Sequence, residues 1–141
     1  MMQIKIENKM LTQVINFLYD LKLKAKPSRH RTKFIKMLSN RLQEFAEQEQ
    51  ELLKEHCHLD AEGNPLKTTD GKGYQLKNVE GFKNDRIELF DEYMVIEGAD
   101  NERMLKVVKR VLEECDKELS GEDAAAYDYL LDQFEKEDEQ E

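Results

Sequence analysis

A long stretch without glycine or proline dominates this sequence and limits the folds open to it. Residues 29–57 contain neither residue type, and Ser28 in front of them is a good helix N-cap. The stretch predicts a helix of roughly 43 Å that buries a narrow stripe against a neighbouring helix, as in a short coiled coil. The stripe follows spacings of three and four, interrupted at Glu49, and consists of Ile35, Leu38, Leu42, Phe45 and Leu52.

The segment before Pro27 supplies the expected partner helix. Residues 9–25 carry apolar side chains at helical spacing. The residue before a proline is pushed out of the α region, which predicts that this helix ends there. We therefore predict that the helices of residues 9–25 and 29–57 form a long antiparallel hairpin. Its seam would include Leu18, Leu38, Leu42 and Phe45.

The remaining segments predict a small β element and further helices. Residues 3–7 alternate polar and apolar side chains and would pair with the strand-like run 94–97. Residues 60–81 are irregular, with a hairpin-type turn at 70–73. A short helix is expected over 82–93.

Two more helices are expected after Gly98, one beginning near Asp100 and one near Ser120. The predicted fold class is α+β and predominantly α: the long hairpin, two further helices and a small β element. We expect residues 1–136 to form a single domain and residues 137–141 to form a disordered acidic tail.

Charge is distributed unevenly along the chain. The formal net charge is −9, yet residues 1–43 carry ten Lys and Arg against two acidic residues. Residues 113–141 carry thirteen Asp and Glu against two Lys. The oppositely charged ends could meet within one monomer, meet between two protomers, or each contact a partner.

The basic stretch of residues 22–41 is the candidate partner-binding segment. No acidic residue lies between Asp20 and Glu44. The stretch could bind nucleic acid through its phosphates, but we favour either a solvated helix face or a docking site for an acidic protein surface. The net charge of −9 and the presence of Phe34 as the one aromatic residue in the stretch argue against nucleic acid. The candidate residues are Lys22, Lys24, Lys26, Arg29, Arg31, Lys33, Lys36 and Arg41.

The cluster His56, Cys57, His58 and Asp60 contains metal-ligating residue types, but its spacing is poor for zinc. Adjacent residues on a helix point about 100° apart, and a zinc site needs a second ligand pair, for which only Cys115 is available. We expect no metal, no cofactor and no catalytic residue, so the protein is predicted not to be an enzyme. A metal-dependent enzyme using this cluster is the weaker alternative.

The sequence also bears on localisation. No apolar run approaches the ~18 residues of a membrane span, and residues 1–10 lack the apolar stretch of a signal peptide. Two cysteines are too few for a disulfide framework. We expect a cytoplasmic protein with no membrane partner.

Five segments carry a resemblance to a known family. They are KIENK (5–9), INFLYDLKLKAKPSRHRTKFIKML (15–38), ELLKEHCHLDAEGNP (51–65), ELFDEYMVIEG (88–98) and ERMLKVVKRVLEECDKELSGEDAAAYDYL (102–130). The chain resembles a family of small uncharacterised proteins encoded by tailed phages and prophages of Gram-positive bacteria. The resemblance implies no catalytic residues. It implies a phage gene product that acts in the host cytoplasm or within the virion.

Together these observations predict a phage-encoded, non-enzymatic protein-interaction module. It would act on a host or defence protein, or in virion assembly, and could also form homo-oligomers. A nucleic-acid-binding accessory protein that uses residues 22–41 is the alternative.

Overall fold

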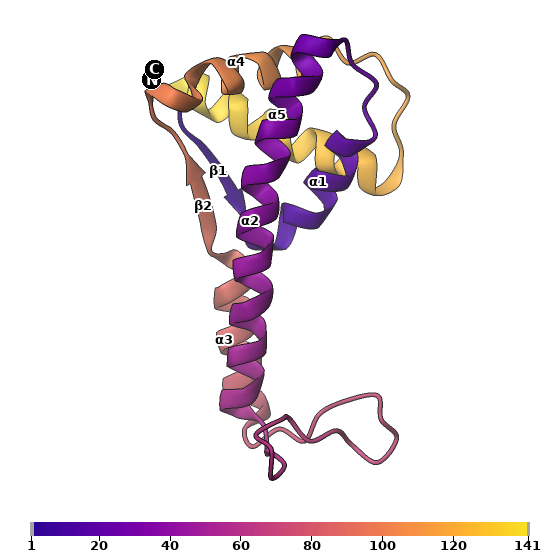
Figure 1. The fold of residues 1–141 in the computed structure, drawn as a ribbon, viewed down its shortest axis with the longest axis vertical. Helices are drawn as coiled ribbons and strands as arrows, with labels where there is room; N and C mark the ends of the chain where they lie inside the picture. The colour runs from indigo at the N-terminus through magenta and orange to yellow at the C-terminus, as the bar shows by residue number, and fades with distance from the viewer. Residues whose placement is uncertain (1, 141) are drawn as a thin grey trace. The chain divides into compact units, whose positions relative to one another are not determined.

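The structure is a computed structural model that describes the backbone of residues 2–140 and the side chains of residues 2–137. Within residues 2–140 the chain forms five α-helices, a short 3-10 helix and a two-stranded antiparallel sheet, which confirms the predicted fold class (Figure 1). The elements are β1 (Ile4–Glu7), η1 (Asn8–Met10), α1 (Leu11–Tyr19), α2 (Ala25–His56), α3 (Val79–Asp91), β2 (Tyr93–Ile96), α4 (Ala99–Glu113) and α5 (Gly121–Gln140).

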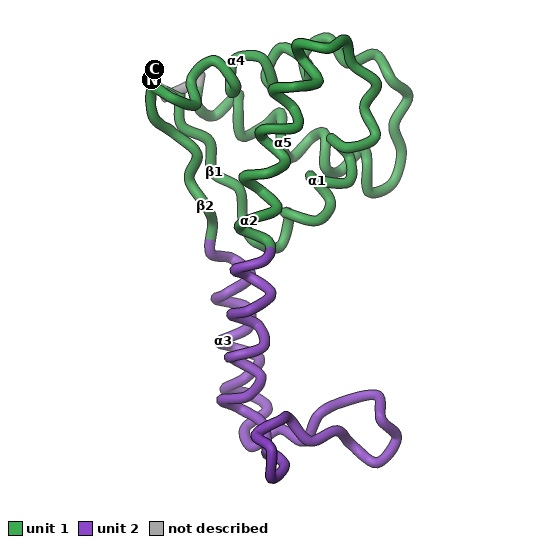
Figure 2. Tube along the Cα trace, in the orientation of Figure 1, with its two compact units in different colours: residues 1–42, 93–141 green, residues 43–92 purple. Residues whose placement is uncertain are grey.

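The chain divides into two compact units (Figure 2). Unit 1 comprises residues 1–42 and 93–141, and unit 2 comprises residues 43–92. Helix α2 contributes residues 25–42 to unit 1 and residues 43–56 to unit 2. The single domain over residues 1–136 stays a prediction. We expected a disordered tail over residues 137–141. Residues 137–140 belong to helix α5, and residue 141 lies outside the described residues.

The sheet of unit 1 forms where the sequence predicts it. Strand β1 pairs antiparallel with β2, with Ile4 opposite Ile96 and Ile6 opposite Met94. Ile4, Ile6 and Ile96 are buried, whereas Lys5 is exposed on the other face, as the alternation of the sequence requires. The predicted pairing of residues 3–7 with 94–97 is confirmed.

Helix α5 organises the core of unit 1, because it packs against α1, β1 and α4. The phenyl ring of Phe17 on α1 meets the ring of Tyr127 on α5 edge to face, with 5.9 Å between the centroids. Phe134 is fully buried. The Tyr127 hydroxyl also donates a hydrogen bond to the Leu112 carbonyl of α4 at 2.9 Å.

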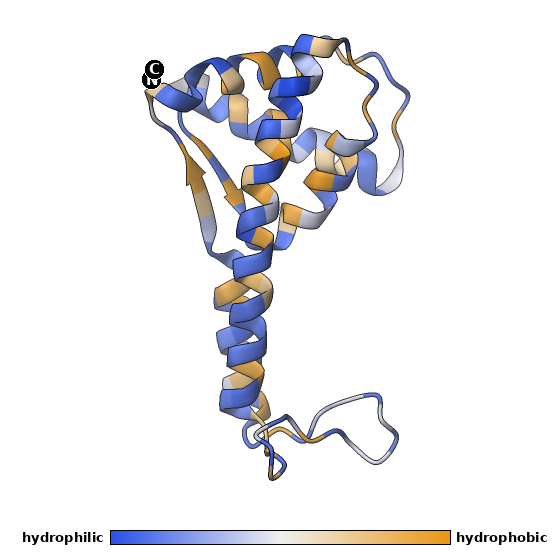
Figure 3. Cartoon of the chain, viewed as in Figure 1, coloured by the Kyte–Doolittle hydropathy of each residue, from blue (hydrophilic) through white to orange (hydrophobic). Residues whose placement is uncertain are grey.

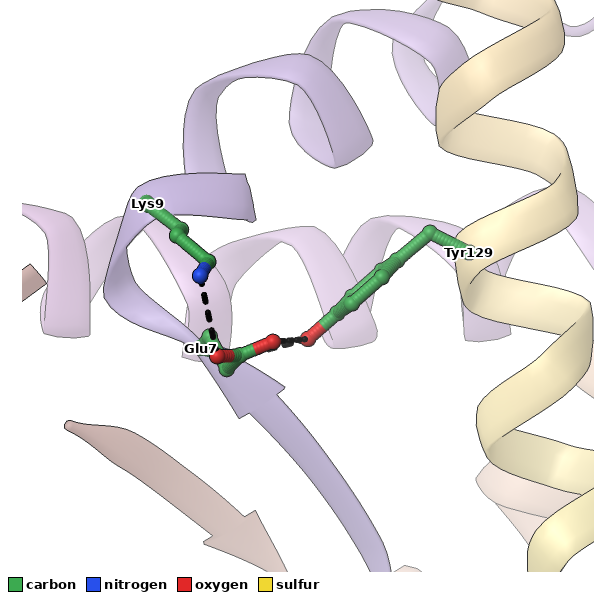
Figure 4. Close-up of polar contacts among 3 residues, drawn as sticks. All are labelled: Glu7, Lys9 and Tyr129. Atoms are coloured by element: carbon green, nitrogen blue, oxygen red, sulfur yellow. Dashed lines mark hydrogen bonds and ion pairs between the residues drawn. The ribbon is translucent and has the colours of Figure 1, made fainter. Parts of the chain in front are cut away.

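A polar contact ties α5 to the end of β1 (Figure 4). The backbone N–H of Glu7 donates to the Tyr129 hydroxyl oxygen at 2.9 Å, and this hydroxyl lies 3.4 Å from Glu7 Oε1. The ammonium of Lys9 lies 3.4 Å from the other carboxylate oxygen of Glu7. Burial raises the pKa of the Tyr129 hydroxyl, and the negative charge of Glu7 contributes to the rise.

The two helices of the predicted hairpin do not pack along each other; each packs against another helix. Helix α1 ends at Tyr19 and packs mainly against α5 rather than along α2. The helix that lies antiparallel to α2 is α3 in unit 2, where the rings of Phe45 and Phe90 are 5.0 Å apart (Figure 1). The expected seam is therefore divided, with Leu18 and Leu38 fully buried in unit 1 and Phe45 buried in unit 2.

Helix α2 also begins earlier than predicted. It starts at Ala25, with Pro27 in its first turn, and the Ser28 N–H donates to the Lys24 carbonyl at 2.9 Å. Proline is tolerated there because the first N–H groups of a helix have no intrahelical partner. Most of the surface of α2 is hydrophilic (Figure 3). Only a narrow stripe of the helix is thus available for burial.

Unit 2 connects α2 to α3 through an irregular segment held by three isolated β-bridges, Cys57 with Leu76, Leu59 with Pro65 and Lys67 with Tyr74. The predicted turn is present but begins earlier: the Gly71 N–H donates to the Thr68 carbonyl at 2.9 Å, and Gly71 has a φ of 71°. Asn78 caps α3, because its side chain accepts a hydrogen bond from the Gly81 N–H at 3.0 Å.

Candidate binding groove of unit 1

Two of the eight predicted binding residues, Arg31 and Arg41, make hydrogen bonds within unit 1. One Nη of Arg31 donates to the carbonyls of Leu18 and Leu21, both at 2.7 Å, and the other donates to Ser28 Oγ at 3.1 Å. The last carbonyls of a helix lack intrahelical donors, so the guanidinium caps the C-terminal end of α1. The Nε of Arg41 donates to Asn8 Oδ1 at 3.0 Å, and Asn8 is only 1% exposed.

Four other predicted residues meet in a basic groove between the N-terminal half of α2 and α4, both in unit 1. The groove has a volume of about 1090 Å³. Its apolar floor consists of Pro27, Val107 and Val111, and its one acidic side chain is Glu114. Its cations are Lys26, Arg29, Lys33 and Lys36 from α2 and Arg103 and Arg110 from α4, with His30 beside them.

The charge of the basic groove is largely uncompensated. Six cations face one carboxylate in a chain whose net charge is −9. Lys33 donates to the Asp100 carbonyl at 3.3 Å. Within residues 2–137, the other five cations make no ion pair. Their charge is therefore available to an anionic ligand.

The last two predicted residues, Lys22 and Lys24, line an adjoining groove of about 730 Å³, which we name the neutral groove. Leu21, Leu23 and Cys115 provide its apolar lining. Three lysines in its lining face three carboxylates, so no net charge accumulates there. The two grooves share Pro27, Val111 and Glu114.

The sequence analysis missed Arg103 and Arg110, which form the α4 wall of the basic groove. These arginines are seven residues apart, which is about two turns, so they lie on the same side of α4 as Val107. The seven-residue spacing could have identified these arginines as one basic face of a helix. The basic face was overlooked because acidic residues such as Glu102 and Glu113 lie close to the arginines in the sequence.

Three of the four side chains of the His56 cluster have separate partners in unit 2. The Nε2 of His56 lies 2.7 Å from Asp85 Oδ2, and its ring packs edge to face on Phe82. Cys57 is buried, with its Sγ 3.7 Å from the Leu66 carbonyl oxygen. Asp60 accepts backbone hydrogen bonds within its own turn, and His58 is exposed.

Among the described residues, no three His, Cys, Asp or Glu side chains are grouped so that they could hold a metal ion. None of the helices described in residues 2–140 combines the length and the apolar character needed to cross a bilayer.

Comparisons with known proteins identify the family. No curated protein and no solved structure matches the chain. The family described as "Protein of unknown function (DUF1617)" matches residues 2–141, nearly the whole chain. The chain therefore belongs to the DUF1617 family of proteins of unknown function.

Proposed function

We propose that this protein is a non-enzymatic protein-interaction module that binds an acidic surface of its partner in the basic groove. The observation that carries the proposal is the uncompensated charge of that groove, in which Lys26, Arg29, Lys36, Arg103 and Arg110 make no ion pair within residues 2–137. Cations on both walls and apolar side chains on the floor fit a protein segment that presents carboxylates beside an apolar contact.

The lining of the groove favours protein over nucleic acid. No aromatic residue lines it, so it offers no platform for stacking bases. An apolar floor contributes to binding a protein segment but not to binding phosphates. The net charge of −9 also repels a polyanion at distances beyond the groove itself.

The resemblance to phage and prophage proteins supports the biological setting of the proposal. The partner would be a host or defence protein in the host cytoplasm, or another component during virion assembly. In both settings the protein supplies a binding surface and no chemistry of its own.

The test is affinity capture from infected host cells with a charge-reversed groove. The variant Arg29→Glu/Arg110→Glu changes one exposed, unpaired cation on each wall. We expect it to lose a specific partner that the natural protein retains. The matched control Lys72→Glu/Lys83→Glu makes the same charge change at exposed positions of unit 2 and should retain that partner. A partner list unchanged by the groove variant would contradict the proposal.

Titration with labelled DNA and RNA separates the alternative. We expect negligible binding at about 150 mM salt. Tight binding that the groove variant abolishes would support nucleic-acid binding instead. For four duplex phosphates, the logarithm of the binding constant should then fall with the logarithm of salt concentration with a slope of about −3.6.

A further inference from the structure

The basic groove and the neutral groove are two ends of one longer groove in unit 1. Pro27 at the start of α2 and Val111 and Glu114 at the C-terminal end of α4 line both of them. The longer groove therefore continues past these two helix ends, where segments 20–24 and 115–117 line it. All of its lining residues belong to unit 1.

The basic end of this groove needs a ligand with several negative charges. Its α2 wall carries a cation at spacings of three, four and three residues, which is about one per turn over roughly 15 Å. Two arginines face them from α4. A ligand with a single carboxylate, such as a fatty acid, would leave most of these charges uncompensated. The six cations are Lys26, Arg29, Lys33, Lys36, Arg103 and Arg110.

The neutral end favours apolar side chains over charged ones. Its lysines Lys22, Lys24 and Lys117 are matched by the carboxylates of Asp20, Glu114 and Asp116. An ion therefore gains little electrostatic energy there, whereas an apolar side chain gains by leaving water. The surface available for that contact comes from Leu21, Leu23, Pro27, Val111 and Cys115.

Glu114 lies where the two ends of the groove meet. Its side chain is exposed, and it is the one acidic residue among the described residues that line the basic groove. It repels a carboxylate of the ligand that comes near the junction. The acidic part of a ligand should therefore end at Glu114, and the apolar part should begin there.

We propose that the groove binds a protein segment in which a run of acidic residues is followed directly by apolar side chains. The acidic run lies in the basic groove, the apolar side chains lie in the neutral groove, and Glu114 sets the boundary between them. The inference rests on the proposed function, because it takes the basic groove as the site for an acidic surface. It adds a second requirement, the apolar side chains beside the carboxylates.

Fluorescence anisotropy with labelled peptides and the full chain tests this requirement. The probe is a peptide of six glutamates and four leucines, made in both orders, and its glutamates match the six cations of the basic groove. The comparison peptide has four serines in place of the leucines. In one of its two orders, the Glu–Leu peptide should bind at least about tenfold more tightly than the Glu–Ser peptide, because its leucines leave water in the neutral groove.

The thiol of Cys115 reports whether the neutral groove is occupied. Cys115 is half-buried in that groove, whereas Cys57 is buried in unit 2 and serves as an internal reference. Saturating Glu–Leu peptide should slow the alkylation of Cys115 by iodoacetamide at least about fivefold, because it blocks access to the thiol. The Glu–Ser peptide should leave this rate unchanged. Mass spectrometry follows the two cysteines separately.

Two variants with matched controls test the residues of the junction and the neutral groove. Glu114→Gln should strengthen binding of the Glu–Ser peptide about twofold by removing a repulsion, whereas Glu113→Gln, an exposed neighbour outside both linings, should not. Leu23→Gln should reduce the preference for the Glu–Leu peptide at least about threefold, whereas Leu59→Gln, at an exposed leucine of unit 2, should retain it. Circular dichroism melts establish that each variant is folded.

The outcomes separate this inference from the proposed function. If the Glu–Ser peptide binds as tightly as both Glu–Leu peptides, and the groove variant abolishes all binding, the inference fails and the proposed function stands. Tighter binding of a Glu–Leu peptide that leaves Cys115 unprotected would also overturn the inference. So would protection of Cys115 by dodecanoate but by neither Glu–Leu peptide, which would indicate a lipid. If no peptide binds at about 1 mM, the inference fails and the capture experiment decides the proposed function.

Discussion

Arg29 and Arg31 lie two residues apart in the basic stretch, yet we expect only the replacement of Arg31 to lower the stability of the fold. In Arg31→Ala, the carbonyls of Leu18 and Leu21 and the hydroxyl of Ser28 lose the guanidinium, which donates to them at 2.7, 2.7 and 3.1 Å. A hydrogen bond to a charged donor contributes about 1.5–3 kcal/mol, but the half-buried site lets water replace part of this.

The helix dipole adds to the expected loss. Helix α1 has no basic residue in its own last turn, so Arg31 supplies the cation at that end, which is worth about 0.3–1 kcal/mol. We expect Arg31→Ala to lower the free energy of unfolding by about 2 kcal/mol, a factor of about 30 in the equilibrium constant. Arg31→Lys should lose about half as much, because it keeps the charge but not the planar fork.

Arg29 is exposed and makes no ion pair within residues 2–137, so Arg29→Ala should change stability by less than about 0.5 kcal/mol. Urea unfolding followed by circular dichroism at 222 nm measures all three variants, and an unchanged m value establishes that the transitions are comparable. If Arg31→Ala unfolds like the natural protein while Arg29→Ala is destabilised, our division of the basic stretch into structural and binding residues is incorrect.

Three further predictions concern the core, two half-buried tyrosines and metal content. Leu38→Ala should cost about 2–5 kcal/mol in urea unfolding because Leu38 is fully buried, and Leu42→Ala should cost less because Leu42 is half-buried; an equal cost would contradict this. Burial is the main cause that raises the pKa values of Tyr127 and Tyr129 in the folded protein. The free energy of unfolding should therefore be unaffected by the ionisation of these groups below about pH 10 and should fall above it, because the tyrosines ionise first in the unfolded chain. Tyr129→Phe should make this alkaline loss of stability smaller in urea unfolding at high pH. Elemental analysis of protein purified without chelator should find well under one zinc per chain, whereas stoichiometric zinc would revive the metal-dependent alternative.

The sequence predicted the elements better than their partners. The length of α2 follows from the absence of glycine and proline, and the β1–β2 pair follows from the alternation around Ile4 and Ile6. The hairpin could not be predicted, because Leu38 and Phe45 fit the same seven-residue repeat yet are buried in different units. Periodicity identifies the face of a helix that is buried but not the element that covers it.

Only one wall of the basic groove could be predicted from the sequence. A run of cations free of acidic residues identified the α2 wall of the basic groove, including Arg29 and Lys33. The α4 wall was not identified, because Arg103 and Arg110 are close to each other only in the fold. Arg31 could not be separated from its neighbours, since its role depends on carbonyls at the end of a different helix.

The order in which the chain is synthesised matters for the two units, because unit 2 is a continuous segment inserted between the two halves of unit 1. Residues 43–92 can make their own contacts, such as Phe45 with Phe90, as soon as they leave the ribosome. Strand β1 instead waits for Tyr93–Ile96, and α1 waits for α5. Because closing such long loops slows folding, we expect Ile4 and Ile6 of β1 to remain unpaired until β2 emerges, and Phe17 of α1 to remain uncovered until α5 emerges. We therefore expect chaperones to bind nascent unit 1.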